Sequence, residues 1–486
     1  MKTFKLKTIE YGDFQTPLEL SDQACQLLTR HGIDPVSIAE PTCGAGAFFI
    51  SALENFPRIR SAFGLDINPE YISNLESLLK GKKKSVDVCF QAADFFEVPW
   101  NAIVNDLPSP LLVVGNPPWV TSDELGRRGR VNLPRKSNFK NLSGIDAITG
   151  KGNFDISEWI LLRILDGLRV EDVMAMLCKT VVARKVLNQT WTRGFRQFEF
   201  MLYRVDAKKY FGVSVDACFL IGRRRRKGGV VSRECLVFEN FYETKPSHTI
   251  SFRDGKLIAD TRMYDRWKQL RGSSQPLWRS GIKHDCSRVM ELNREGSLYR
   301  NGFGENVKLE GDYLYPMLKS SDLANGSVTK LDRVMIVTQK TVGEDTGVIQ
   351  NKAPKTWAYL QKYGFSLDGR SSSVYKGRPR FSVFGVGNYS FSPWKVAVSG
   401  FYKNLRFRVI GPAEQKPVIL DDTAYFIPCE TKEKARRLAE ALNSEVVSEF
   451  FKAYIFWDAK RPVTAGLLNR LDLNALDEFF QAGNFK

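Results

Sequence analysis

The sequence has little of what metal centres, disulfide frameworks and membrane spans are built from. It contains three histidines and eight cysteines in 486 residues, and no two cysteines are spaced as Cys-x-x-Cys. Because zinc sites and disulfide scaffolds need such residues in clusters, neither is expected, and the thiols are expected to be reduced in a cytoplasm. No apolar run approaches membrane-spanning length, and the N-terminal residues lack the apolar segment of a signal peptide.

Negative charge is also in short supply. There are 54 Asp and Glu residues against 71 Lys and Arg, which gives a net charge of +17. A basic surplus of this size indicates a polyanionic partner, and without membrane features nucleic acid is favoured. The length suits two or three domains, and a hydrophobic content of 43% argues against disorder.

Residues 1–225 and 226–486 differ in composition and in the pattern of their apolar residues. The first part alternates short apolar runs with stretches of helical periodicity, which predicts an α/β fold with a doubly wound, Rossmann-like sheet. The second part is rich in turns, aromatics and basic residues, and it predicts a mixed α+β domain that includes one helix over 431–451. Between them, Arg223–Gly229 is expected to be an exposed linker or a phosphate contact.

Three motifs at the ends of successive predicted strands suit a nucleoside ligand. Gly44 and Gly46 permit a tight turn that a ligand can approach closely. Asp66, which follows Gly44 by 22 positions, can accept hydrogen bonds from both hydroxyls of a ribose. Asp94 can accept from an adenine amino group, and Phe95 can cover the ring. Each motif alone also suits an ordinary turn or loop, but their order indicates a cofactor site.

A fourth motif, Asn116-Pro117-Pro118-Trp119, follows the apolar run Leu111–Val114. Two prolines cannot continue a central strand, so the chain leaves the sheet here. The Asn116 side-chain oxygen and the Pro117 carbonyl can accept both hydrogens of one amino group, and Trp119 can stack on the ring that carries it. Such a site suits an amino group that attacks an electrophilic methyl group. The structural alternative is a rigid turn.

Taken in order, these motifs resemble the gamma class of amino-methyltransferases that act on adenine in DNA. The resemblance covers residues 11–222 by motif and implies S-adenosylmethionine as cofactor, double-stranded DNA as partner and N6 of a flipped adenine as target. It makes residues 1–225 the catalytic domain and residues 226–486 a DNA target-recognition domain. A restriction-modification or phage-defence role follows. Any cognate endonuclease is expected on a separate chain, because the sequence has no Pro-Asp dipeptide.

The resemblance also implies roles for single residues. Gly12–Pro17 resembles an N-terminal element whose threonine, here Thr16, touches the methionine part of the cofactor. Glu40 opens the glycine-rich motif and is counted among the cofactor-binding residues. Phe211 matches an aromatic residue that stacks on the flipped base, with core packing before a strand as the alternative. Lys151–Asp155 resembles the segment that opens a helix beside the cofactor pocket.

Two basic segments have two interpretations each. Six basic residues within 126–140 form either a loop that closes over DNA or a solvated loop. Lys376–Arg408 alternates basic and aromatic residues, which suits either a DNA-facing surface or a buried β-meander.

Three rival functions remain at this point. A protein glutamine methyltransferase shares the Asn-Pro-Pro motif but needs no large basic C-terminal domain. An RNA adenine methyltransferase is not separated from a DNA enzyme by charge. A catalytically silent DNA-binding subunit would not need an intact Asn116–Trp119 motif.

Overall fold

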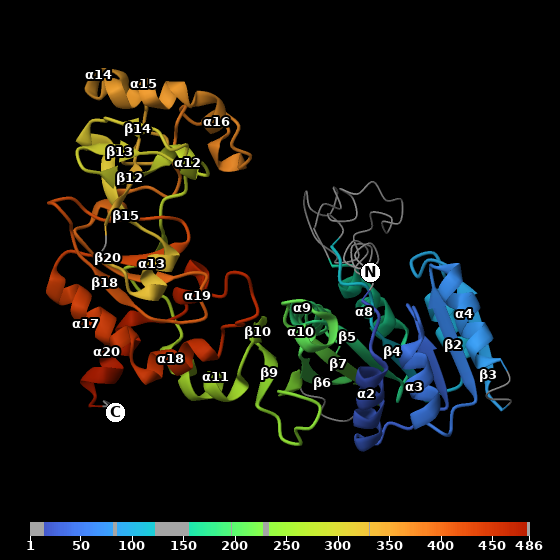
Figure 1. Ribbon diagram of the computed structural model, residues 1–486. Coiled ribbons are helices and arrows are strands. Elements are labelled where there is room, and N and C mark those ends of the chain that lie inside the picture. Colours follow the sequence, from blue (N-terminus) through green and yellow to red (C-terminus); the bar gives the residue numbers. More distant parts are fainter. Residues whose placement is uncertain are drawn as a thin grey trace. The chain divides into compact units, whose positions relative to one another are not determined.

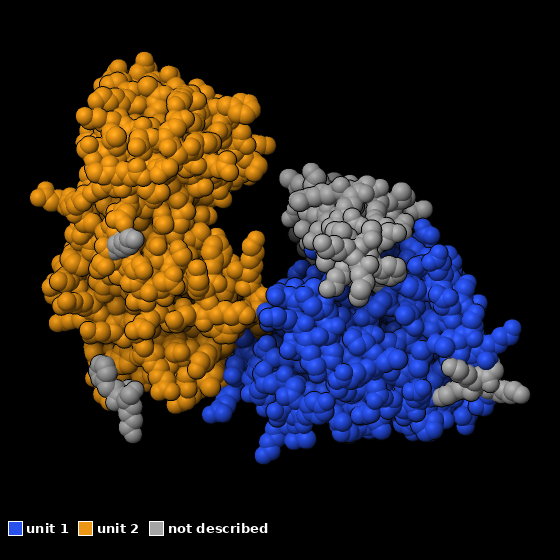
Figure 2. All heavy atoms as spheres, in the orientation of Figure 1, with its two compact units in different colours: residues 1–262 blue, residues 263–486 orange. Residues whose placement is uncertain are grey.

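The computed structural model describes residues 14–80, 85–121, 155–195, 197–226, 233–329 and 331–483. The chain divides into two compact units, residues 1–262 and residues 263–486 (Figure 2). The expected boundary between residues 225 and 226 lies earlier in the chain. The difference arises because three strands that follow residue 226 continue the sheet of the first unit.

The first unit is built on a ten-stranded sheet with the order β10-β9-β8-β6-β7-β5-β4-β1-β2-β3 (Figure 1). Its strands are β1 (Ser37–Glu40), β2 (Ser61–Asp66), β3 (Asp87–Ala92), β4 (Leu111–Gly115), β5 (Val173–Lys179), β6 (Phe198–Val205), β7 (Ala217–Arg224), β8 (Glu234–Phe238), β9 (His248–Arg253) and β10 (Lys256–Ile258). Its helices are α2 (Leu18–Arg30), α3 (Ala47–Asn55), α4 (Pro69–Leu79), α5 (Trp100–Asp106), α8 (Ile156–Gly167), α9 (Thr180–Thr192) and α10 (Ala207–Phe211).

The central strands are parallel and buried on both faces. All five residues of β4 are buried, as the continuous apolar run at 111–114 predicts. Leu112 and Val114 belong to a core that contains residues of α2 and α3, whereas Val113 has the opposite orientation and is also fully buried. Helices α8 and α9 contact β5. The predicted α/β doubly wound sheet is therefore confirmed.

The basic run at 223–226 is not the linker that its composition predicts. β7 lies antiparallel between β5 and β6, and its pairing extends to Arg223 and Arg224. The Arg223 guanidinium is 2.6 Å from the Glu171 carboxylate, and that of Arg225 is 2.7 Å from Glu199. Acidic residues on neighbouring elements thus accommodate these charges at the end of the sheet, while residues 227–232 lie outside the described part of the chain.

The second unit is a mixed α+β structure with a four-stranded sheet, β11-β20-β17-β18, and a six-stranded sheet, β14-β13-β12-β16-β15-β19. Its strands are β11 (Arg279–Ser280), β12 (Glu291–Glu295), β13 (Leu298–Arg300), β14 (Asn306–Val307), β15 (Leu314–Leu318), β16 (Arg333–Ile336), β17 (Trp394–Ser399), β18 (Arg408–Ile410), β19 (Ile419–Leu420) and β20 (Ala424–Cys429). Its helices are α12 (Ser287–Met290), α13 (Ser320–Asn325), α14 (Ile349–Lys352), α15 (Pro354–Lys362), α16 (Gly364–Asp368), α17 (Lys432–Leu442), α18 (Glu445–Lys452), α19 (Ala465–Leu468) and α20 (Leu473–Gln481), and α11 (Thr261–Trp267) spans the unit boundary. Short 3-10 turns are η1 (Lys268–Leu270), η2 (Gly311–Tyr313), η3 (Ser373–Tyr375) and η4 (Asn388–Phe391).

The single helix expected over 431–451 is wrong, because two helices, α17 and α18, occupy this range. Asn443 ends α17 and turns its side chain to the backbone of Phe407, with hydrogen bonds of 3.0 and 2.8 Å. Ser444 then caps α18, its hydroxyl accepting from Val447 N–H. Asparagine and serine compete with helical hydrogen bonding in this way, so the break has a local chemical cause.

Candidate active site

The glycine-rich turn connects β1 to α3. Gly44 and Gly46 have φ values of +50° and +79°, in the left-handed region that favours glycine. A Cβ on Gly44 would lie 2.8 Å from the Gln15 side-chain oxygen, and that oxygen already accepts from Ala45 N–H at 2.9 Å. The left-handed backbone at both positions therefore suits glycine, as the sequence predicts.

Asp66, at the end of β2, is tied to this turn. One carboxylate oxygen accepts from Gly44 N–H and the other from Asn68 N–H, each at 2.8 Å. Asp66 therefore fixes the geometry of the turn and also lines the cavity beside it.

The loop after β3 presents Asp94, Phe95 and Phe96 to the same cavity. The Asp94 carboxylate accepts from Phe96 N–H at 2.9 Å, which closes a short turn. The Phe95 ring is buried and packs on Trp100, with ring centroids 5.0 Å apart. The neighbouring Phe96 stacks on Trp159 of α8.

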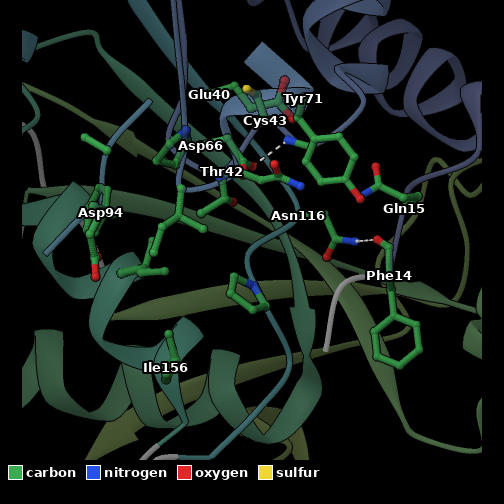
Figure 3. Close-up of a pocket in the computed structure, with 18 of the residues that line it drawn as sticks. Phe14, Gln15, Glu40, Thr42, Cys43, Asp66, Tyr71, Asp94, Asn116 and Ile156 are labelled. Atoms are coloured by element: carbon green, nitrogen blue, oxygen red, sulfur yellow. Dashed lines mark hydrogen bonds between the residues drawn. The ribbon is translucent and has the colours of Figure 1, made fainter. Parts of the chain in front are cut away.

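Asn116 follows β4 directly and has an ordered side chain. Its amide nitrogen donates to the Phe14 carbonyl at 2.9 Å, a contact drawn in Figure 3. Its Oδ1 is buried and has no hydrogen-bond partner among the described residues. The side chain is thus held with its acceptor oxygen unsatisfied at the cavity.

Three aromatic rings cluster beside Asn116. The rings of Trp119 and Phe211 lie 5.2 Å apart in an edge-on arrangement, and Phe14 lies 5.7 Å from Trp119 and 6.1 Å from Phe211. Trp119 is 7% exposed. The fold therefore brings together the two aromatic residues that the sequence assigns to the target base, although neither lines the cofactor cavity.

The cavity has a volume of about 530 Å³ and opens at the carboxyl ends of β1, β2 and β4. In the sheet order β1 has β2 on one side and β4 on the other, which is the switch point where doubly wound sheets bind ligands. The sequence-predicted residues that line it are Thr16, Glu40, Gly44, Asp66, Asp94, Phe95, Asn116 and Pro118. Gly46, Pro117, Trp119 and Phe211 are not among the lining residues.

Glu40 is the most deeply buried charged residue of this lining, at 3% exposure. Burial raises the pKa of its carboxyl well above the usual range, and the nearby Asp66 carboxylate adds to the shift, whereas a backbone hydrogen bond with Phe49 opposes it. Its Oε2 has no hydrogen-bond partner in the described part of the chain. Burial thus favours the neutral carboxyl, and a cationic group of a bound ligand would favour its ionised form.

Several lining residues have no role in the sequence-based interpretation. Gln15 directly precedes Thr16, and Tyr71 lies in the first turn of α4 after the Asn68-Pro69 helix start. Ile156 and Ile160 on α8 are four residues apart, the spacing of one helix face. The resemblance implies a helix beside the cofactor pocket after Asp155, and this spacing indicates which face of that helix forms the wall.

Three sequence-predicted segments fall outside the described residues. They are Gly12 and Asp13, the basic insertion at 126–140, and residues 151–154 before Asp155. In the part of the chain that is described, no cluster of histidine, cysteine or acidic residues could hold a metal ion. None of the described helices is long and apolar enough to cross a membrane.

Comparison with known proteins gives one extensive sequence match. The chain is 44% identical over 473 residues to the type II methyltransferase M.NspV from Nostoc sp., covering 96% of this chain and 97% of that protein. No protein-family model matches the sequence.

The solved structures bear on the fold. The type IIL restriction-modification enzyme MmeI, solved in complex with DNA, matches with a TM-score of 0.52 at 13% identity, covering 97% of this chain and 66% of that one. The methyltransferase subunit of a type I restriction-modification system from Streptococcus thermophilus matches 46% of this chain with a TM-score of 0.31. The sequence relationship to M.NspV places this chain in the family of type II methyltransferases of restriction-modification systems, which use S-adenosylmethionine.

Proposed function

We propose that this methyltransferase modifies the exocyclic N6 of adenine at a specific site in double-stranded DNA, as part of a restriction-modification or phage-defence system. The observation that carries the proposal is the Asn116 side chain. Because its amide nitrogen is bound to the Phe14 carbonyl, its buried Oδ1 remains as an acceptor at the cavity. An acceptor followed by two prolines suits a primary amine better than a hydroxyl, since an amine offers two hydrogens.

The cavity fits S-adenosylmethionine by the chemistry of its lining. Glu40 and Thr16 are assigned to the methionine end, Asp66 to the ribose and Asp94 to the adenine amino group. The glycine turn lets the backbone approach the cofactor closely, while its Gly44 and Ala45 N–H groups are bound by the Asp66 and Gln15 side chains. When bound, the cofactor supplies a methyl group on a positively charged sulfur, and that methyl is electrophilic.

The protein's own contribution is to orient the target amine. The Asn116 oxygen and the Pro117 carbonyl accept its two hydrogens, which shifts electron density onto the nitrogen and directs its lone pair. Orientation of this kind supplies much of the rate of group transfers. Trp119 and Phe211, which belong to the aromatic cluster beside Asn116, are assigned to the adenine after it has left the duplex.

The second unit is assigned to DNA recognition in this scheme. Base edges in the grooves carry sequence information, whereas phosphates fix position and orientation. The net charge of +17 supports a polyanionic partner.

The test is nucleoside analysis after methylation with isotopically labelled S-adenosylmethionine. Mixed duplex DNA and RNA are incubated with the full chain, digested to nucleosides and separated by mass spectrometry. Labelled N6-methyladenine from DNA is expected, and sequencing for modified bases should place it at one recurring sequence. Label found only in RNA or in cytosine would overturn the proposal, and DNA binding without any transfer would identify a silent subunit.

A further inference from the structure

Helix α8 holds the loop after β3 through two side chains one turn apart. Trp159 stacks on Phe96, with ring centroids 4.5 Å apart and planes inclined by 14°. Arg163 donates hydrogen bonds to the carbonyls of Phe95 and Phe96 at 3.2 Å each and of Val98 at 2.7 Å. Its guanidinium also lies over the Phe95 ring, 5.4 Å from the centroid.

Three carbonyls within four residues thus converge on one guanidinium. The planar fork of arginine presents several donors in fixed directions, which a lysine cannot reproduce. Two of the three residues that supply these carbonyls are buried, since Phe95 and Val98 are 4% and 5% exposed. Carbonyls left without a donor in such surroundings destabilise the loop conformation.

The same helix and the same loop form adjoining walls of the cavity. Ile156 and Ile160 line it from α8, and Asp94 and Phe96 line it from the loop. Arg163 follows Ile160 by three residues, so it lies one turn further along the helix. The helix that walls the cavity therefore also sets the position of the adjoining wall.

We infer that Arg163 is a positioning residue for the cofactor, which holds the loop over 94–98 so that Asp94 and Phe96 meet the adenine end. It does not itself line the cavity. The inference rests on the proposed assignment of Asp94 to the adenine.

The first test compares Arg163→Met with Arg163→Lys in the full-length protein. We expect Arg163→Met to weaken S-adenosylmethionine binding about tenfold and Arg163→Lys to weaken it less, because lysine satisfies fewer carbonyls. At saturating cofactor, kcat should stay within about twofold of wild type, because only cofactor positioning is disturbed. Calorimetry gives the dissociation constant, and thermal unfolding checks that each variant is folded. If Arg163→Met is unfolded, the measurements are made on Arg163→Lys.

The second test localises the effect. 5′-Methylthioadenosine contains the adenosine part of the cofactor and no methionine carboxylate or amine. Arg163→Met should therefore weaken its binding by the same factor as the binding of S-adenosylmethionine. In an Asp94→Ala background the effect of Arg163→Met should largely disappear, because the two residues act through one loop. The matched control is Arg193→Met. Arg193 follows α9 and pairs with Asp166 of α8, and neither residue lines the cavity.

Unchanged affinity in both Arg163 variants, or an equal loss in Arg193→Met, would overturn the inference. So would full additivity with Asp94→Ala. These results are separable from failure of the proposed function, which would appear as absence of N6-methyladenine in the products of the wild-type protein.

Discussion

Asn116 combines two properties that its residue type alone does not guarantee. Its nitrogen is occupied by the Phe14 carbonyl, and its oxygen is left as a buried acceptor. We expect Asn116→Ala to reduce methyl transfer by about 10²–10³-fold, the usual effect of losing one preorganised polar group at a reacting centre. Cofactor affinity should change by no more than about twofold, because the residue is assigned to the target amine.

A radiolabelled transfer assay and calorimetry measure the two effects of Asn116→Ala separately. Asn105→Ala, at an exposed position on α5, serves as control. Transfer at the wild-type rate in Asn116→Ala would contradict the assignment.

Asp66 has a double role, because its carboxylate binds the Gly44 and Asn68 amides and also lines the cavity. Asp66→Ala should weaken S-adenosylmethionine binding by on the order of 1.5–3 kcal/mol, the usual worth of hydrogen bonds to a charged group. Asp34→Ala, which removes a solvent-exposed ion pair with Arg58, is the matched control. An unchanged dissociation constant in Asp66→Ala would reduce the residue to a loop anchor.

The raised pKa of Glu40 predicts that the stability of the protein depends on pH. Because its folded pKa is raised, the folded state binds the proton more tightly than the unfolded state, and this favours folding most at low pH. As pH rises above the unfolded pKa towards the folded one, the carboxyl lowers the free energy of unfolding by up to about 1.4 kcal/mol per pH unit. In Glu40→Gln this part of the decline in the free energy of unfolding with rising pH should be absent.

Urea unfolding of wild type and Glu40→Gln at pH 5 and pH 8 measures the difference. The free energy of unfolding of Glu40→Gln, relative to wild type, should be higher at pH 8 than at pH 5. Glu54→Gln, at an exposed position of α3, should follow wild type at both pH values. Parallel pH profiles for wild type and Glu40→Gln would show that the carboxyl is not held neutral.

At the scale of elements, the basic and aromatic stretch Lys376–Arg408 divides into buried and exposed parts. Phe381 and Lys395 are fully buried, and Arg380 pairs with Asp368 at 2.7 Å. It contains one complete strand, β17, and ends at the start of β18, so it is not a continuous meander. Its exposed residues include 401–404 and Arg406, which belong to the loop over 400–407 between these two strands.

Both ends of that loop are anchored. Ser399 Oγ accepts from the amides of Phe401 and Tyr402 at 3.4 and 3.3 Å, and the backbone of Phe407 is bound by Asn443. An anchored loop holds its exposed side chains at low entropic cost, which favours contact with a partner.

If the loop faces DNA, replacing Lys403 and Arg406 together by Ala should lower the slope of log affinity against log salt by roughly 1 to 2 units. The measurement is fluorescence anisotropy across a salt series with cognate and scrambled duplexes. Arg378→Ala with Arg380→Ala is the comparison, and its smaller expected effect follows from the Arg380–Asp368 pair. If the variant with Lys403 and Arg406 replaced keeps the wild-type slope, this loop does not contact DNA phosphates.

For the whole molecule, the division into two units predicts separable functions. A fragment of residues 1–262 should bind S-adenosylmethionine like the full chain, because every residue that lines the cavity belongs to it. It should lose site-specific DNA methylation. A fragment of residues 1–225 should be less stable, since it lacks β8, which pairs with β6 over Phe200–Tyr203.

Calorimetry, thermal unfolding and a methylation assay on cognate duplex compare the two fragments with the full chain. Sequence-specific methylation by residues 1–262 would contradict the assignment of DNA recognition to the second unit. If the two fragments are equally stable, residues 226–262 are not needed for the stability of the first unit, and its boundary can be placed after residue 225.

The order of local motifs along the chain was sufficient to predict the α/β fold and eight of the residues that line the cavity. Glycine at 44, a carboxylate at 66 and two prolines after Asn116 each have a local chemical meaning, and parallel strands bring the ends that carry them to one edge. The wrong or shifted predictions, such as the linker at 223–226 and the helix over 431–451, are places where composition was opposed by strand pairing or by a capping side chain.

Only the tertiary structure decided which distant side chains meet. The pairing of Trp119 with Phe211, the hydrogen bond from Asn116 to Phe14 and the contacts of Arg163 with the loop after β3 join residues separated by 65 or more positions. Such contacts depend on the order and register of strands in the sheet. A periodic sequence pattern specifies which face of an element is buried, but not which neighbour covers it.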